Sequence, residues 1–350
     1  MSPGPATSVA RSIDEMDTRW LEQALGTTVA SVRARRIGTG QTSSTYVLDL
    51  DAHGLPPTLV VKLAEGDATA RLRVAAGHRS EIGFYRHLAA KVDMPTARCW
   101  HAAITEDGAG FTLIMEDLSP RRPGRQVDGC PPAAARAAVV DLAALHAPLW
   151  NDHSLLELDF LAPVSETRAS FLAELYATGT PHFVERCGGG LEPDDVETLC
   201  RTGEVLVEWH TARREPFSLI HGDYRLDNLM FSPSDQSVIA VDWQTATIGL
   251  PARDLAYFLG TSLDTPSRRH IEEDLVSHYH AGLVARGVAG YDLARCFDDY
   301  RFAMFQGPMI TVLGSLMATA QRSAESDEMF LAMARRSCAA IRDLRSFDTL

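Results

Sequence analysis

The sequence has no excess of basic residues, no paired-cysteine motif and no long uninterrupted apolar run. Its 33 Lys and Arg stand against 46 Asp and Glu, a formal net charge of −13. General nucleic-acid binding is therefore not expected, because phosphate backbones attract clustered basic side chains. This balance still allows nucleotide binding, since a few placed cations and a metal ion can neutralise phosphates locally.

The cysteines also exclude several classes of protein. The six of them are scattered and form no CxxC pair, which is typical of reduced thiols and argues against a disulfide framework or a zinc site. They are Cys99, Cys130, Cys187, Cys200, Cys296 and Cys338.

No segment has the pattern of a membrane span or a secretory signal. The first twenty residues lack the apolar run of a signal peptide. The most apolar stretch, 304–320, is interrupted by Gln306, Gly307, Pro308 and Gly314, whereas a spanning helix needs about 20 apolar residues. We expect a core helix there, no membrane association and a cytoplasmic protein.

Strand and helix patterns divide the chain unevenly. Strand patterns dominate 32–63 and 111–115, with a helical pattern at 80–90 between them. Residues 121–132 are rich in Pro, Gly and Arg, which is typical of a linker. Helical patterns dominate afterwards, except for a strand-rich island at 218–243. They cover 13–25 near the start, then 133–149, 163–176, 194–209 and 271–350.

This order predicts an α+β protein of two lobes. The first, residues 1–118, is small and β-rich, with a hinge at its end. The second, residues 119–350, is larger and helical. No internal repeat is present.

The island at 218–243 concentrates polar residues at strand ends. Apolar strands at 218–220 and 229–231 flank a loop that contains Asp223 and Asn228, and a third apolar strand leads to Asp242. An isolated His-Gly-Asp is also compatible with an ordinary turn, but the joint spacing favours three oxygen donors at one point. Magnesium prefers such oxygens, and phosphoryl transfer needs a metal, cations and a proton acceptor.

These residues carry a family resemblance. HGDYRLDN at 221–228 followed by VDW resembles the HGDxxxxN and Asp motifs of the aminoglycoside phosphotransferase and choline kinase group. The segments IMEDL, LHAPLW, VDWQ and DLAYFL resemble its ecdysteroid-kinase-like (CHK-type) branch more closely. The group shares the protein-kinase fold. The resemblance runs from Gly38 to the late 250s and implies ATP and Mg²⁺ as cofactors. It also implies that the lobe of residues 1–118 binds the nucleotide, and that the lobe of residues 119–350 carries the catalytic loop, the metal-binding loop and the acceptor pocket.

The resemblance implies roles for four residues of the island. Asp223 would be the catalytic base that orients the substrate hydroxyl. Asn228 and Asp242 would ligate magnesium. Arg225 occupies the place where protein kinases often carry a phosphate-contacting lysine, and we assign it that contact.

Two further residues are expected to support the loop. His221 would hold the loop backbone and transfer no proton. Asp254 resembles the buried aspartate that braces the catalytic loop from the next helix, although an aspartate before an apolar helix is equally suited to an N-cap.

A short hairpin near the start of the chain is expected to cover the phosphates. Gly38 and Gly40 would let backbone N–H groups approach them, and Ser43 or Ser44 would add hydroxyl donors. The third glycine of the protein-kinase loop is missing, so an ordinary hairpin turn remains an alternative.

The resemblance also places a lysine, a glutamate and a hinge. Lys62 lies in an apolar strand and matches the lysine that holds the α- and β-phosphates, and Glu81 would be its helical partner. The alternatives are an exposed strand lysine and a solvated helix carboxylate. Backbone groups of Glu116 and Leu118 would meet the adenine.

The expected acceptor is a small hydroxylated molecule. Only eleven residues separate Asp242 from Asp254, no A-P-E motif follows, and Gly222 replaces the arginine of HRD, so a protein substrate is disfavoured. Within this class we favour a neutral or weakly polar acceptor over a cationic aminoglycoside or choline-type one. Rival interpretations are a non-catalytic ATP-binding module and a metal-dependent hydrolase.

Overall fold

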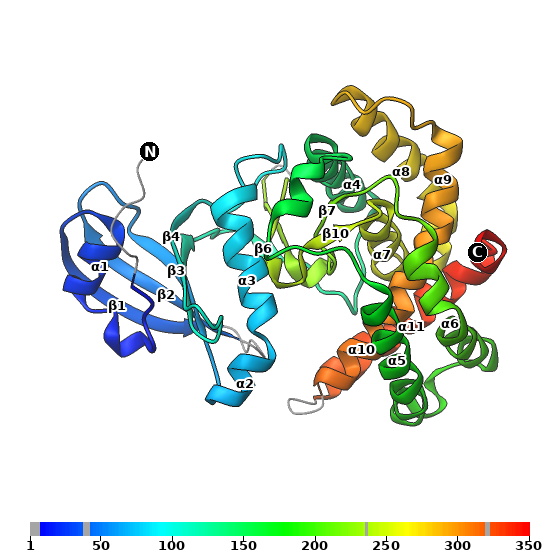
Figure 1. Cartoon of the computed structure of the whole chain (residues 1–350), viewed down its shortest axis with the longest axis horizontal. Helices are drawn as coiled ribbons and strands as arrows, with labels where there is room; N and C mark the ends of the chain where they lie inside the picture. The colour runs from blue at the N-terminus through cyan, green and yellow to red at the C-terminus, as the bar shows by residue number, and fades with distance from the viewer. Residues whose placement is uncertain (1–7, 38–42, 235–236, 319–322) are drawn as a thin grey trace. The chain divides into compact units, whose positions relative to one another are not determined.

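The computed structural model describes residues 8–37, 43–234, 237–318 and 323–350. The chain forms two compact units, whose elements are labelled in Figure 1. The first contains Met1–Ala90, Thr96–Ser119 and the short segment Asp242–Thr245. The second contains Lys91–Pro95, Pro120–Val241 and Ala246–Leu350.

The first unit is built on a five-stranded antiparallel sheet of order β1-β2-β3-β5-β4. Leu48, Leu59, Val61 and Ile114 from its three middle strands are fully buried, as expected of a sheet face that packs on a core. The strands are β1 (Val29–Ile37), β2 (Ser43–Ala52), β3 (Thr58–Ala64), β4 (Cys99–Ile104) and β5 (Phe111–Glu116).

Helices complete this unit. The pattern at 13–25 predicts one helix, but the structure has a 3₁₀ turn at Ile13–Glu15 and then α1 (Thr18–Leu25). The break occurs because the Asp17 side chain accepts the N–H of Trp20 and caps a new helix. Two more helices, α2 (Ala68–Arg73) and α3 (Ala75–Gly83), precede a π-helical turn, Phe84–Leu88.

The second unit is mainly helical. Two small sheets interrupt the helices, β10 with β7 and β6-β8-β9. Their strands are β6 (Arg122–Pro123), β7 (Ser218–Ile220), β8 (Leu229–Phe231), β9 (Val238–Ala240) and β10 (Thr247–Gly249). The helices are α4 (Pro132–His146), α5 (Glu166–Cys187), α6 (Pro193–Ala212), α7 (Ala252–Ser262), α8 (Thr265–Ala285), α9 (Leu293–Phe302), α10 (Gln306–Met317) and α11 (Ala324–Asp343).

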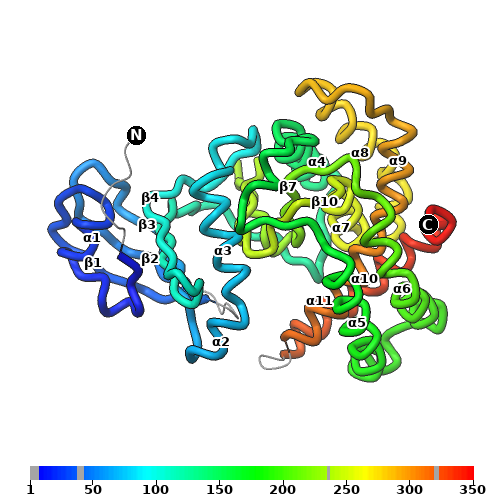
Figure 2. The backbone as a smooth tube through the Cα atoms, in the orientation of Figure 1, coloured from blue at the N-terminus to red at the C-terminus, as the bar shows by residue number. Residues whose placement is uncertain are grey.

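Helix α7 lies at the centre of this unit. Every one of its residues is buried, which is typical of a helix covered on all sides. Helices α4, α8, α9, α10 and α11 all pack against it (Figure 2). A helix enclosed in this way is a rigid support for the polar side chains in its first turns.

The arginine-rich segment at 121–132 does not behave as a free linker. Arg122 and Pro123 form β6, which pairs with β8, and Gln126 is buried. This stretch is therefore part of the wall around the loop between β7 and β8.

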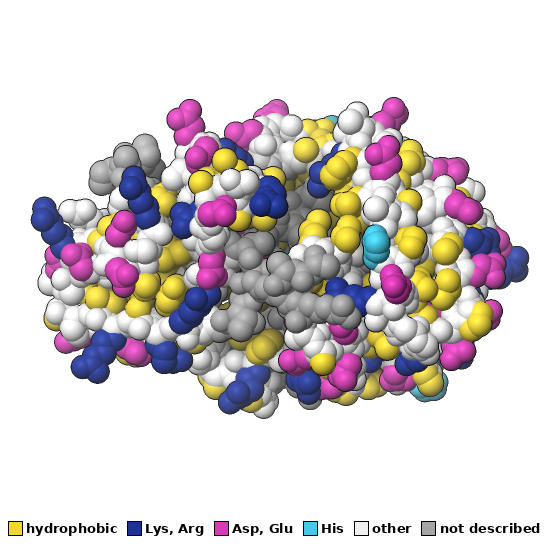
Figure 3. All heavy atoms as spheres, turned by 90° about the horizontal axis from the view of Figure 1, so that it is seen from below, with side chains coloured by type: hydrophobic (Ala, Val, Ile, Leu, Met, Phe, Trp, Pro, Cys, Tyr) yellow, Lys and Arg dark blue, Asp and Glu magenta, His cyan; other side chains and the backbone are white. Residues whose placement is uncertain are grey.

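Among the described residues, none of the helices is both long enough and apolar enough to span a bilayer. On the face drawn in Figure 3, acidic and basic side chains of the described residues are interspersed.

Candidate active site

The first unit brings Lys62, Glu81 and Asp242 together. Nζ of Lys62 donates to both carboxylate oxygens of Glu81, at 2.8 and 2.9 Å, and to Oδ1 of Asp242 at 3.2 Å. Lys62 comes from β3, Glu81 from α3, and Asp242 directly precedes the 3₁₀ turn Trp243–Thr245. A strand, a helix and a segment far along the chain thus meet at one ammonium group.

The electrostatics of this cluster favour a charged lysine. Burial alone would lower the pKa of Lys62, but the carboxylates of Asp242 and Glu81 outweigh it and raise the pKa above its usual value. The Glu81 side chain is fully buried, whereas that of Asp242 is 46% exposed. Asp242 also has a positive φ of 67°, a backbone region that a non-glycine residue adopts at a cost and that is frequent at functional sites.

The Trp243 ring anchors this segment. It stacks on Phe84 at 3.6 Å between centroids with an interplanar angle of 8°, and the Gln244 amide donates to Glu81 at 3.3 Å. These contacts fix the backbone on which Asp242 stands.

The hairpin expected to cover the phosphates is described only in part. Gly38 and Gly40 lie outside the described residues. Ser43 and Ser44 are buried at the start of β2, where Ser43 pairs with Ala64 and Ser44 with Leu63 of the lysine strand.

The expected hinge lies at the end of β5. The N–H of Glu116 donates to the carbonyl of Arg98 at 2.8 Å, so any adenine contact from Glu116 would have to come through its carbonyl. Leu118 is partly buried two residues later.

In the second unit, the loop between β7 and β8 brings Asp223, Arg225 and Asn228 together. Nδ2 of Asn228 donates to the Asp223 carbonyl at 2.9 Å and to its Oδ2 at 3.0 Å. Both bonds use the amide nitrogen, so the amide oxygen of Asn228 has no hydrogen bond from the described residues. A free amide oxygen beside a carboxylate suits a hard cation.

Arg225 is tied to the same carboxylate. Its Nε donates to Oδ2 of Asp223 at 3.3 Å and its Nη1 to Oδ2 of Asp227 at 2.5 Å. Burial would lower the pKa of Arg225, but Asp223 and its neighbours raise it above its usual value. The guanidinium therefore stays charged while 21% of the side chain is exposed.

Asp254 from α7 holds the backbone at the start of this loop. Its two oxygens accept the N–H of His221 at 2.6 Å and that of Gly222 at 2.9 Å, and His146 lies 3.3 Å from Oδ2. Burial would raise the pKa of Asp254, but these partners lower it below its usual value. Gly222 has a φ of 81°, which only glycine adopts without strain.

His221 supports the loop in a second way. Its Nε2 lies 3.1 Å from the Val241 carbonyl, and its Nδ1 accepts the N–H of Asp223 at 3.3 Å. The ring thus connects the start of the loop between β7 and β8 to the end of β9.

Two residues that contact the loop were not predicted from the sequence. Tyr257 donates its hydroxyl to Oδ1 of Asp223 at 2.8 Å; it stands one helical turn after Asp254, a spacing that places both on one face of α7. Oε1 of Gln126 accepts the N–H of Leu226 at 2.9 Å. No local pattern in the sequence could have identified Gln126.

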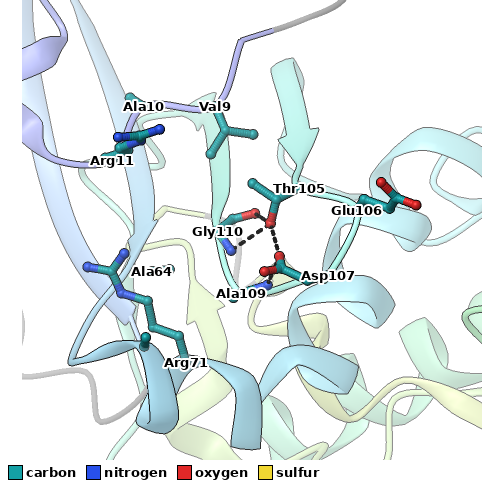
Figure 4. A pocket seen from close by; sticks show the side chains of 11 residues that line it. Val9, Ala10, Arg11, Ala64, Arg71, Thr105, Glu106, Asp107, Ala109 and Gly110 are labelled. Carbon is teal, nitrogen blue, oxygen red and sulfur yellow. Dashed lines mark hydrogen bonds between the residues drawn. The ribbon is translucent and has the colours of Figure 1, made fainter.

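One cavity lies in the first unit and contains none of the predicted site residues. It has a volume of about 780 Å³ and is lined by residues such as Arg11, Arg71 and Asp107. Figure 4 shows that much of its polar wall is a turn bonded to itself: Thr105 donates to Asp107 at 2.6 Å, and Asp107 accepts the N–H of Ala109 at 2.9 Å. These groups already have partners.

A sheet with a glutamate-paired lysine, followed by a helical unit with a braced Asp-and-Asn loop, defines a protein of kinase-like architecture. Residues 33–294 match the family model of the phosphotransferase enzyme family, and the chain belongs to this family.

Known structures support the fold. The ethanolamine kinase of Plasmodium vivax is 16% identical, with a TM-score of 0.58 over 98% of this chain and 92% of that one. The phosphotransferase APH(2″)-IIIa, solved with GDP and kanamycin, is 15% identical, with a TM-score of 0.55 over 90% and 96%. The kinase-like fold with a β-rich N-terminal and a helical C-terminal part, predicted from the sequence, is confirmed.

Curated relatives match over a short stretch. Human acyl-CoA dehydrogenase family member 11 is 60% identical over 65 residues, which are 18% of this chain and 8% of that protein. The matched stretch thus covers less than a tenth of that relative's length.

Proposed function

We propose that this protein is a small-molecule kinase that transfers the γ-phosphoryl group of ATP, with Mg²⁺, to a hydroxyl group of its acceptor. The observation that carries the proposal is the Lys62 cluster: a buried ammonium that is held by Glu81 and reaches the half-exposed Asp242. A buried cation is costly without anionic partners. Here Glu81 and Asp242 are those partners, and solvent can reach the Asp242 carboxylate.

In this proposal Lys62 binds the α- and β-phosphates, and Glu81 keeps its ammonium oriented. Ser43, Ser44 and the glycines at positions 38 and 40 would add donors to the phosphates. The carbonyl of Glu116 and the N–H of Leu118 would meet the adenine.

Asn228 and Asp242 would hold the metal ion. Magnesium commonly binds through one or two protein oxygens together with water and substrate phosphates, so an amide and a carboxylate would be sufficient. When bound, it neutralises charge that develops on the transferred group.

Asp223 would accept the proton of the attacking hydroxyl. Tyr257, Arg225 and Asn228 all donate to its carboxylate, so the base is fixed in direction before the acceptor arrives. Preorganisation of this kind is a large part of what a phosphoryl-transfer enzyme contributes. Arg225, still charged, would meet the transferred phosphoryl group.

We further propose an acceptor that is not polycationic, as in the ecdysteroid-kinase-like branch that the sequence resembles. A polycationic acceptor would need carboxylates to bind its ammonium groups, and Asp298 and Asp299 are adjacent acidic residues of α9. Both pair with Arg213, at 2.8 and 2.6 Å, and Asp299 is fully buried. Asp299 also pairs with Arg295 and Asp298 with Arg301, so arginines already neutralise both carboxylates.

The test is an ATP-consumption screen with magnesium against apolar alcohols, sugars, sterols, macrolides, choline-like amines and aminoglycosides. The proposal expects at least one acceptor to be phosphorylated, with activity lost in Asp223→Asn. Tight ATP binding without transfer to any acceptor would favour the non-catalytic module instead. Absence of ATP binding would refute the proposal.

A further inference from the structure

A second cavity, in the helical unit, has features that the proposed phosphoryl transfer does not use. Its volume is about 280 Å³, close to the lower limit of about 300 Å³ for small-molecule sites. The ends of α6 and α9, strand β10 and the segment before α5 form its walls. Most of the wall is apolar, and the residues that matter here are Val164, Trp209, Phe217, Ile248, Leu250 and Phe302.

One wall of this cavity carries an arginine whose charge is poorly compensated. Arg253 is 9% exposed, and its Nε and Nη2 both donate to the neutral amide oxygen of Gln306, at 2.9 and 2.7 Å. No carboxylate of the described residues forms a salt bridge with it. Burial lowers the pKa of Arg253 to about 10, against the opposing effect of Asp254. The centroid of the Trp209 ring lies 4.3 Å from its guanidinium carbon, and this cation–π contact offsets part of the free-energy cost of burying the charge.

Arg268, in the same unit, is a buried arginine whose charge is compensated by carboxylates. It is also almost completely buried, at 1% exposure, but it forms salt bridges with Glu272 and Asp343. A buried cation ordinarily has such partners. The difference indicates that an anionic partner of Arg253 does not come from the described residues.

A histidine without partners lines the same cavity. His210 is 8% exposed, and neither of its ring nitrogens has a hydrogen-bond partner among the described residues. Its ring lies 4.7 Å from that of Trp209, on which Arg253 also stacks. A buried polar group without a partner is costly, and its presence in a cavity wall points to a ligand.

We propose that this cavity binds a small apolar molecule with a single carboxylate, which Arg253 and His210 hold. One guanidinium without an ion pair matches one negative charge. The other charged residues of the wall add little: Arg213 is neutralised by Asp298 and Asp299, and Arg214 and Glu215, which have opposite charges, are both exposed. A carboxylate has two oxygens, one for the guanidinium and one for the N–H of a neutral imidazole. The apolar wall would cover the rest of the molecule.

The cavity is connected to the catalytic loop by side chains of the same unit. Gln306, which accepts from Arg253, donates through Nε2 to the Gly222 carbonyl at 3.1 Å. Asp254, the next residue after Arg253, accepts the N–H of Gly222. A ligand that draws the guanidinium into the cavity would therefore alter the support of the residue before Asp223. This coupling rests on the proposed function, whereas the binding itself does not.

The direct test is calorimetric titration of the full chain, without nucleotide, with hexanoate and 3-phenylpropionate. The corresponding primary amides and amines serve as matched neutral and cationic probes. We expect saturable binding of the carboxylates and at least about tenfold weaker binding of the amides, since hydrogen bonds to charged groups contribute about 1.5–3 kcal/mol. The amines should not bind.

Three variants locate the site. Arg253→Met removes the charge and keeps much of the side-chain length, while Val164→Trp fills the cavity and leaves the charge in place. Both should abolish binding of hexanoate. Arg335→Met changes an exposed arginine outside the cavity and should bind as the unmodified chain does. Thermal melting of each variant identifies any that fails to fold, and the two independent variants keep the test decisive.

Three outcomes would overturn the proposal: no saturable binding of either carboxylate at millimolar concentration, equal binding of amide and carboxylate, or unchanged binding in Val164→Trp. The coupling has its own readout, hydrogen exchange of the segment 221–228. Hexanoate should slow that exchange in the unmodified chain but not in Gln306→Ala. Equal protection in both chains would refute the coupling. Because neither measurement uses kinase activity, failure here is distinguishable from failure of the proposed function.

Discussion

The hydroxyl of Tyr257 donates a 2.8 Å hydrogen bond to Oδ1 of Asp223, so the side chain that we propose as the base is held from the buried helix α7. Burial raises the pKa of Tyr257 well above its usual value, and the Asp223 carboxylate adds to this effect. The hydroxyl therefore remains a donor at neutral pH. The same helix supplies Asp254, which holds the loop backbone, so one rigid element sets both the position and the orientation of Asp223.

The first prediction concerns Asp223 itself. Asp223→Asn should abolish phosphoryl transfer, with a loss of about 10²–10⁴ in rate that is typical of removing a general base. ATP binding should stay largely intact, because the adenine and phosphate contacts are assigned to other residues. Single-turnover transfer and ATP titration of the same preparation check both statements. Transfer near the unmodified rate would refute the role.

The second prediction separates orientation from proton transfer. Tyr257→Phe should lower kcat by about 10-fold to 100-fold, since one hydrogen bond to a charged group contributes about 1.5–3 kcal/mol. It should fold normally, because the ring remains and only the hydroxyl is lost. Steady-state kinetics beside a thermal melt is the measurement. A kcat that does not change would show that Arg225 and Asn228 are sufficient to orient the carboxylate.

The third prediction compares the two proposed metal ligands. Asp242→Ala should weaken binding of Mg·ATP and turnover more than Asn228→Ala does, because a carboxylate neutralises more charge than an amide. Asp242→Ala also removes one of the two carboxylates that hold Lys62. Calorimetric titration of Mg·ATP into both variants checks the order, and equal binding by Asp242→Ala and the unmodified chain would contradict it.

The kinase-like fold could be predicted from the sequence, because it follows from local patterns and a family motif. The same motif located the strand lysine and the loop from His221 to Asn228, whose roles stay predictions. Contacts between distant segments had no such signal. Gln126 lies in a stretch that has the composition of a linker, yet it holds the Leu226 N–H across 100 positions. Gln306 reaches Gly222 from α10 in the same way.

The prediction for residues 13–25 followed the apolar periodicity and left a local capping residue out of account. The apolar periodicity at 13–25 favours a single helix, whereas Asp17 begins a new one by accepting the N–H of Trp20. Tyr257 could have been identified from its spacing to Asp254, since residues three apart share a helix face. The sequence could not show, however, that the Tyr257 hydroxyl donates to Oδ1 of Asp223, because this depends on how α7 packs against the loop.

The fourth prediction concerns the acceptor. We expect higher kcat/KM for neutral or weakly polar alcohols than for kanamycin-type amines, because Asp298 and Asp299 already pair with arginines. The measurement is kcat/KM for both kinds of acceptor, in competition with each other, at low and at high salt. Efficient phosphorylation of the amines that is sensitive to salt, and lost in an Asp298→Asn/Asp299→Asn variant that still folds, would contradict this preference.

The fifth prediction follows from His210 and concerns stability. Burial lowers the pKa of His210 to about 3, and the neighbouring charges of Arg253 and Arg168 act in the same direction. In the unfolded chain a histidine titrates near about 6.5. Between these values the unfolded chain binds a proton that the folded chain does not, so the free energy of unfolding decreases as the pH falls from about 6.5 toward 3. The full contribution of one such group is about 1.4 kcal/mol per pH unit within this window.

Urea unfolding of the unmodified chain and of His210→Leu, from pH 7.5 to 4.5, tests the assignment, the two limits being about one unit above the unfolded-state pKa and about two below it. The variant has no group to titrate at this position, so its stability should depend less steeply on pH below 6.5. His270→Leu changes an exposed histidine and should follow the unmodified chain. Parallel curves for the unmodified chain and His210→Leu would show that the buried imidazole is protonated in the folded state.

A carboxylate ligand in the cavity should stabilise the unmodified chain and leave Arg253→Met unaffected, since a ligand that binds only the folded state adds to its stability.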